Sequence, residues 1–215
     1  VTGGGWGNNE SQYYTNDEKN VRVQNSKLII EALKEDFYGC KYTSSRIKTK
    51  KSWKYGRFEI RAKLPRGIGT WAAFWGLPTE WKYGNWPNSG EIDVLEHVGF
   101  EEGHIVSSVH NIAHHGDLSR SDQTKYVIAK YVVNSFNDYV LEWDEKEIKT
   151  FINDKLIFSY PKNDQPWERW PFDEKFHFIL NIAIGGNWGG MKGIDDTAFP
   201  TKMEIEHFRV YKKNT

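Results

Sequence analysis

The chain has 215 residues and carries 29 basic and 29 acidic side chains, and this zero net charge excludes a nucleic-acid binder or membrane-surface protein that works through bulk positive charge. Its single cysteine, Cys40, excludes an internal disulfide and a cysteine-based metal site. Aromatic residues make up 15% of the sequence, including 10 tryptophans, which indicates either a large aromatic core or many rings that face a ligand.

Short runs in which apolar and polar residues alternate predict β-strands along most of the chain. In chain order, the expected strands are 21–24, 27–31, 42–48, 56–64, 70–76, 91–97, 105–110, 137–143, 147–152, 155–159, 177–184 and 204–211. Turn signals such as Pro65-Arg66-Gly67 and Asn153-Asp154 separate them. One short helical turn is expected at 164–170, and no longer helical period is evident.

This pattern predicts an all-β fold, a two-sheet β-sandwich or a jelly roll. We find no linker, low-complexity block or internal repeat, so residues 1–215 are predicted to form one domain. The lack of helices argues against a Rossmann or barrel-type α/β enzyme. The lack of a G-x-S-x-G motif argues against a serine hydrolase.

The densest chemical signal is the acidic strand that begins at Glu91. Side chains alternate along a strand, so Glu91 and Asp93 share one face, but strict alternation would place Glu96 on the apolar face. One inserted residue, a β-bulge, would return Glu96 to the face of the other two acids. The two glutamate carboxyls would then lie about 5 Å apart, the separation of a retaining glycosidase pair.

Three crowded carboxyl groups cannot all ionise freely, so their pKa values should separate and give one nucleophile and one proton donor. Asp93, between the two glutamates, could tune both. The alternative is an acidic surface face that binds a cation. The apolar residues that alternate with the acids favour a strand buried on one side, with the acids in a cleft.

This strand resembles the catalytic E-[IL]-D-x-x-E signature of glycoside hydrolase family 16, in the bulged form of laminarinase-type endo-β-1,3-glucanases. Further segments resemble other blocks of that family in collinear order over nearly the whole chain. They are residues 5–10 with 12–15 (GWGNNE and QYYT), 42–46 (YTSSR), 55–59 (YGRFE), 69–75 (GTWAAFW) and 181–188 (NIAIGGNW).

The resemblance implies a concanavalin-like jelly roll of two antiparallel sheets, with a substrate cleft on its concave face, and makes 1–215 a glycoside hydrolase catalytic domain. It implies retaining endo-hydrolysis of β-1,3-glucan with Glu91 as nucleophile, Glu96 as acid/base and Asp93 as the assisting acid, and no catalytic cofactor. Hydrolysis of mixed-linkage glucan or algal galactan, and a non-catalytic glucan-binding module, are the alternatives.

Several other residues are candidate sugar contacts, because indoles stack on sugar rings and amides, guanidinium groups and imidazoles bind hydroxyls. For each of them, core packing, loop capping or a surface position is the competing interpretation. His110 could also tune Glu96. The candidates are Asn8, Arg46, Trp71, Trp75, Trp86, His110, Asn181 and Trp188.

The sequence departs from the family at its N-terminal end, where the first strand before the 5–10 block is missing. Family members often bind a structural Ca²⁺ between that segment and a carboxylate on the last strand, for which Glu206 is the candidate here. The last strand would lack its usual partner, and such an open edge could pair with another chain. A monomer is expected, with this edge pairing as the alternative.

The implied partner is a neutral β-glucan polysaccharide, without nucleic acid or membrane. The apolar runs are too short to span a bilayer. The family implies an extracellular, periplasmic or cell-surface location.

Overall fold

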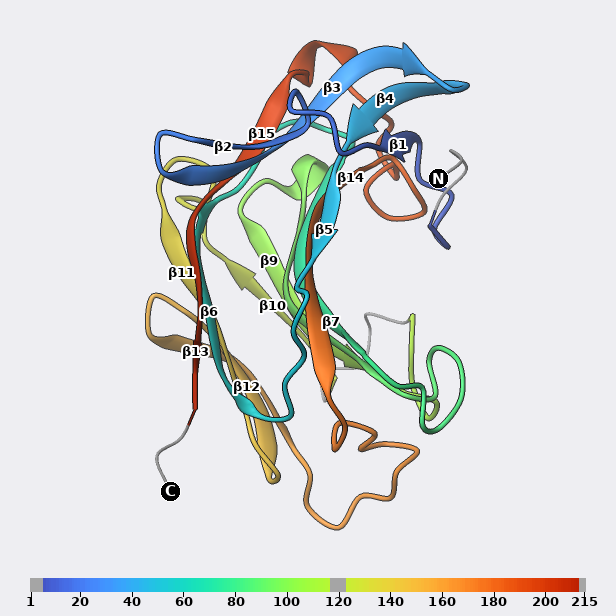
Figure 1. Ribbon diagram of the computed structural model, residues 1–215, viewed down its shortest axis with the longest axis vertical. Coiled ribbons are helices and arrows are strands. Elements are labelled where there is room, and N and C mark those ends of the chain that lie inside the picture. Colours follow the sequence, from blue (N-terminus) through green and yellow to red (C-terminus); the bar gives the residue numbers. More distant parts are fainter. Residues whose placement is uncertain (1–5, 117–122, 213–215) are drawn as a thin grey trace.

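The computed structural model describes residues 6–116 and 123–212, which form two sheets packed face to face (Figure 1). One sheet has nine strands, in the order β1-β4-β3-β15-β6-β11-β12-β13, with β2 paired to β3. Its strands are β1 (Gln12–Tyr14), β2 (Val21–Gln24), β3 (Lys27–Phe37), β4 (Cys40–Ser44), β6 (Gly56–Lys63), β11 (Asn137–Trp143), β12 (Glu147–Ile152), β13 (Lys155–Pro161) and β15 (Thr201–Tyr211).

The second sheet has six strands in the order β10-β9-β8-β7-β14-β5. They are β5 (Arg46–Lys48), β7 (Thr70–Pro78), β8 (Glu91–Val98), β9 (His104–His110), β10 (Thr124–Ile128) and β14 (Phe176–Ile184). Two short 3₁₀ helices, η1 (Gly99–Glu101) and η2 (Asp196–Ala198), complete the assigned elements. The predicted jelly-roll sandwich is therefore confirmed, and the pairing is antiparallel except between β1 and β4.

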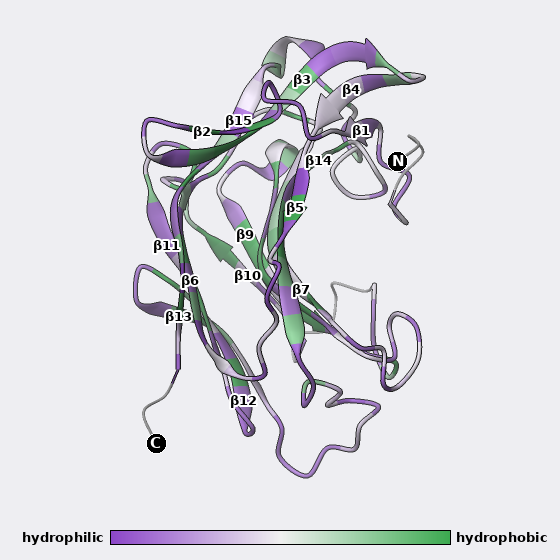
Figure 2. Cartoon of the chain, in the orientation of Figure 1, coloured by the Kyte–Doolittle hydropathy of each residue, from purple (hydrophilic) through white to green (hydrophobic). Residues whose placement is uncertain are grey.

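Apolar side chains from both sheets meet in one core between them, as expected when each strand buries every second residue. Hydrophobic residues accordingly lie along the strands, whereas the connecting loops are mostly hydrophilic (Figure 2). Several of the many aromatic residues pack in this core. Trp143 and Trp170 are each 2% exposed, and Trp143 Nε1 donates to the Phe172 carbonyl at 3.0 Å. Cys40 is a buried free cysteine.

The strand predictions differ from the structure at two points. The expected strand at 42–48 is interrupted at the buried Ser45, where the chain passes from β4 in one sheet to β5 in the other. The strands β1 and β10 were not predicted. The single turn expected at 164–170 is present, because the Trp170 N–H donates to the Pro166 carbonyl at 2.9 Å, the bonding pattern of one helical turn.

The last strand, β15, is paired differently along its length. Thr201 to Ile205 pair with β3, and Glu204 and Ile205 also pair with β6, whereas from His207 to Tyr211 the described residues pair it only with β6. A shift in register separates the two halves. The expected open edge is thus limited to the second half of this strand.

Candidate active site

The acid trio lies on β8, and the register of the neighbouring strands shows how it is displayed. Asp93 pairs with Ser108 of β9, and Glu96 pairs with Val106. From one pair to the next the chain advances three residues on β8 but only two on β9, so β8 carries one additional residue. Val94 and Leu95 are 3% and 0% exposed and both belong to the core. The predicted β-bulge is confirmed, because two consecutive apolar residues turn inward and Glu96 returns to the side of Asp93.

The bulge is held by a buried hydroxyl network. Ser107 Oγ donates to the Val94 carbonyl at 2.7 Å and accepts from Thr150 Oγ1 at 2.9 Å. Ser107 is completely buried. This contact satisfies a carbonyl at the bulge, where the normal ladder is interrupted.

Ser107→Ala is therefore expected to lower the free energy of unfolding by about 1–3 kcal/mol, because the Val94 carbonyl and the Thr150 hydroxyl lose a buried partner. Chemical denaturation measures this change. Ser159→Ala, at an exposed serine of β13, is the matched control and should stay within about 0.5 kcal/mol of the wild type. Equal stabilities of the two variants would contradict a structural role for the Ser107 network.

Asp93 is the central group of the trio. It is 2% exposed, its Oδ2 accepts from Ser108 Oγ at 2.9 Å, and it lies 3.0 Å from His110 Nε2. Burial alone would lower the pKa of His110, but the bond to Asp93 and the charges of Asp93 and the two glutamates raise this pKa to about 9. At neutral pH His110 is therefore an imidazolium, and its positive charge lies beside the Asp93 carboxylate.

The two glutamates each have an indole donor. Trp86 Nε1 donates to Glu91 Oε2, and Trp71 Nε1 donates to Glu96 Oε1 at 3.0 Å. Burial and the charge of Asp93 raise the pKa of Glu96 to about 8, and the same two causes raise the pKa of Glu91 well above its usual value. A carboxyl group with a pKa of about 8 is protonated at neutral pH, as a general acid must be.

A row of paired residues crosses the six-stranded sheet. Arg46 on β5 pairs with Asn181 on β14, Asn181 with Ala73 on β7, and Ala73 with Glu96 on β8. Directly paired residues share one face of a sheet, so this register places Arg46 and Asn181 on the face that carries Glu96.

A sequence profile of glycosyl hydrolases family 16 matches residues 8–207. The chain belongs to this family. A beta-glucanase of Rhodothermus marinus is 45% identical over 224 residues, which are 99% of this chain and 77% of that protein. The clotting factor G alpha subunit of Tachypleus tridentatus is 38% identical over 97% of this chain, which spans only 30% of that longer protein.

The fold agrees with this membership. The laminarinase structure from Rhodothermus marinus matches with a TM-score of 0.94 and 44% identity, covering 99% of this chain and 88% of that one. The chain is thus a glycoside hydrolase with the jelly-roll fold, as the residues around the acid trio suggested. Among residues 6–116 and 123–212, no helix has the length and apolar character to cross a bilayer.

The structure of this family 16 chain brings most of the predicted sugar contacts around one cleft. The Arg46 guanidinium lies 4.5 Å from the Trp75 ring centroid. Trp75 Nε1 donates to Asn181 Oδ1 at 2.8 Å, and Asn181 Nδ2 donates to the Tyr14 hydroxyl at 3.1 Å. These bonds fix the Trp75 ring, so that it can present a rigid face to a sugar ring.

The remaining candidates lie at the borders of the cleft. The Trp188 ring packs edge-on against Trp71, with centroids 5.5 Å apart. Trp86 is 46% exposed and lies 6.2 Å from the His110 ring. Asn8 joins the site through its backbone, because its carbonyl accepts from the Asn187 N–H at 2.8 Å, which supports the loop-capping interpretation for this residue.

Sequence reasoning missed a second group on the same side of the sheet, provided by the N-terminal segment. Glu10, 6% exposed, accepts from Gln12 Nε2 at 2.6 Å and lies 3.4 Å from the Tyr14 hydroxyl. The Trp6 ring also packs on Arg46, with its centroid 4.6 Å from the guanidinium. The two-residue spacing of 10, 12 and 14 is the signal that could have identified this shared face.

The calcium candidate Glu206 is engaged differently. Its carboxylate accepts from Arg61 Nε at 2.9 Å, so a cation there would have to compete with an arginine. The Ca²⁺ site stays a prediction, and Glu206 is a poor ligand for it in this arrangement.

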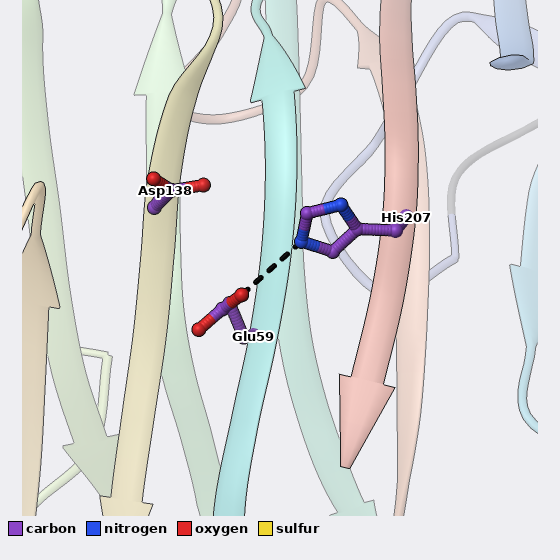
Figure 3. A group of neighbouring side chains, drawn as sticks. All are labelled: Glu59, Asp138 and His207. Carbon is purple, nitrogen blue, oxygen red and sulfur yellow. Dashed lines mark hydrogen bonds and ion pairs between the residues drawn. The ribbon is translucent and has the colours of Figure 1, made fainter.

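One other group of ligand-type side chains converges within the described residues: Glu59, Asp138 and His207, on the three neighbouring strands β6, β11 and β15 (Figure 3). His207 Nε2 lies 3.1 Å from Glu59 Oε1. Arg57 pairs with Glu59 at 3.3 Å and Arg61 pairs with Asp138 at 3.2 Å. Because the arginines already neutralise both carboxylates, this group is an ion-pair network on the nine-stranded sheet.

Proposed function

We propose that this chain hydrolyses internal bonds of β-1,3-glucan with retention of anomeric configuration. The observation that carries the proposal is the bulged acid strand, in which Glu91, Asp93 and Glu96 share one side of β8 and the pKa of Glu96 is raised to about 8. The similarity to a beta-glucanase and to a laminarinase supports the substrate class.

In the first step, a Glu91 carboxylate oxygen attacks the anomeric carbon while the Glu96 carboxyl gives its proton to the leaving glycosidic oxygen. The products are a glycosyl ester on Glu91 and the released part of the chain. In the second step, the Glu96 carboxylate removes a proton from water, whose oxygen attacks the same carbon and releases Glu91. Two inversions leave the configuration unchanged.

The neighbours of the two glutamates fit these roles. The indole N–H of Trp86 and the imidazolium of His110 both favour the ionised form of Glu91, the form that can attack. The charge of Asp93 keeps the proton on Glu96 until it is transferred. Formation of the ester removes the Glu91 charge, which lowers the pKa of Glu96 and suits its change from acid to base.

This mechanism uses only protein side chains, so we propose that catalysis needs no metal or other cofactor. We also propose a monomer that acts outside the cytoplasm, because a polymeric glucan does not cross a membrane. Its neutral substrate needs stacking and hydroxyl contacts instead of charge, consistent with a net charge of zero.

Product analysis on laminarin, lichenan and agarose tests this function. Rapid release of short oligosaccharides from laminarin, with slower release from lichenan and none from agarose, is the expected result. Preference for lichenan or agarose would support the mixed-linkage or galactan alternative. Binding to laminarin without any release of reducing ends would support the non-catalytic module, for which three crowded carboxyl groups offer no advantage.

A further inference from the structure

A groove of about 490 Å³ lies beyond β5, at the edge of the six-stranded sheet. Figure 1 shows this region, where the β3–β4 hairpin projects past β1 and the N-terminal end of the structure. The groove is formed by the N-terminal segment, the following loop and the tip of that hairpin. Its lining is Trp6, Tyr13, Tyr14, Thr15, Asn16, Asp17, Phe37, Tyr38 and Arg46.

This groove is continuous with the catalytic cleft, because Arg46 belongs to both. Its guanidinium lies over both neighbouring indoles, 4.5 Å from the Trp75 ring centroid and 4.6 Å from the Trp6 ring centroid. Trp6 in turn packs against Tyr14, with ring centroids 5.6 Å apart. A chain that leaves the acids across Trp75 and Arg46 therefore reaches Trp6 and then the groove.

At its far end, the groove presents an aromatic cluster to solvent. Tyr38 stacks on Tyr13 at 5.7 Å and 28° and packs edge-on against Phe37 at 4.9 Å. Tyr38 is 83% exposed. A ring this exposed at the tip of a hairpin contributes little to folding, and a fixed, solvent-facing aromatic surface suits the apolar face of a sugar.

The lining of the groove also includes polar groups. Asn16 and Asp17 follow β1 and are both exposed. An amide and a carboxylate beside aromatic rings can bind the hydroxyl groups at the rim of a pyranose. Aromatic faces together with hydrogen-bonding groups match a neutral sugar chain, whereas a hydrophobic peptide would leave these polar groups unpaired.

We propose that the groove between Trp6 and Tyr38 is a distal binding site for the same β-glucan chain that occupies the catalytic cleft. This proposal rests on the glucanase activity proposed above and adds that long chains are held by a second aromatic surface far from the acids. The enzyme should then favour polymers and long oligosaccharides over short ones.

The test compares the wild type with Tyr38→Asn and Tyr38→Trp on laminari-oligosaccharides of three to eight units and on laminarin. Asparagine suits the left-handed backbone at Tyr38, where φ is 47°, and it removes the ring. We expect kcat/KM of Tyr38→Asn to fall by about fivefold on the longest substrates, with the loss shrinking as the chain becomes too short to reach the groove. Tyr38→Trp should restore the wild-type length dependence.

Tyr211→Asn is the matched control, because Tyr211 is 44% exposed on β15 of the nine-stranded sheet. This variant should have the kcat/KM of the wild type at every oligosaccharide length. Equal activity of Tyr38→Asn and wild type at all lengths would overturn the distal site while leaving the glucanase function intact. If the wild type cleaves no glucan, the function fails first. Laminarin affinity electrophoresis then still decides the site, because a Tyr38→Asn protein that migrates as the wild type does would reject it.

Discussion

Glu91→Gln is expected to lower kcat on laminarin by at least about 10⁴-fold, because the amide oxygen cannot form the glycosyl ester on which both steps depend. The fold should be retained. Glutamine has the shape of the acid, its amide oxygen can accept the same bond from Trp86 Nε1, and it carries no charge that burial would penalise. Reducing-end assays and a thermal unfolding curve measure the two outcomes.

A small external nucleophile separates a missing nucleophile from a general loss of the site. With Glu91→Ala, azide can enter the space of the carboxylate and attack an activated aryl glucoside, giving the glycosyl azide of inverted configuration. Glu145→Gln, at an exposed glutamate between β11 and β12, is the control and should keep wild-type activity. Near-normal laminarin cleavage by Glu91→Gln would end the proposed mechanism.

The form of the acid strand could be predicted because charge and burial conflict in a regular strand. Glu96 would have faced the core next to Ile92 and Val94, and a carboxylate without a partner is too costly there. The structure resolves this conflict with the bulge, whose additional inward residue enlarges the core and whose carbonyl is bound by Ser107. Local sequence was sufficient here, because the apolar residues of the strand identify its buried face and therefore also the opposite face that carries the acids.

The boundary between the sheets could not be predicted in the same way. Residues 42–48 were predicted as one strand, yet β4 and β5 belong to different sheets, and the change occurs at Ser45. Ser45 Oγ donates to the Thr15 carbonyl, a partner 30 positions away. Only the tertiary arrangement of the N-terminal segment determines where this strand must end.

The same dependence on distant partners explains the residues that sequence reasoning missed. Strand β1 has three residues, too few for a periodic signal, and it pairs in parallel with β4. Tyr14 reaches the cleft only because Asn181, 167 positions later, donates to its hydroxyl. The acids come from one strand and were predictable, whereas the sugar-facing surface is assembled from segments that are far apart in the sequence.

Glu96→Gln is expected to lower kcat on laminarin by about 10²–10⁴-fold, because the poor leaving group no longer receives a proton. An aryl glucoside whose phenolate leaves without protonation should form the ester on Glu91 normally and then release it slowly. Azide should accelerate that release and give the glycosyl azide of retained configuration, the opposite of the product expected from Glu91→Ala. Identical azide products from both variants would contradict the assignment of the two roles.

The pH profile gives a second test of Glu96, since its pKa is raised to about 8 by burial and the charge of Asp93. The acid must be protonated to act, so wild-type kcat/KM on laminarin should be maintained below this value and fall as the pH rises through about 8. Glutamine cannot titrate, so Glu96→Gln should lose this alkaline decline along with most of its activity.

The aryl glucoside, which needs no proton in the first step, should show no such decline in kcat/KM even with the wild type. An alkaline limb that persists unchanged in Glu96→Gln would assign the titration to another group, and His110, whose pKa is raised to about 9 beside Asp93, would then be the one to replace.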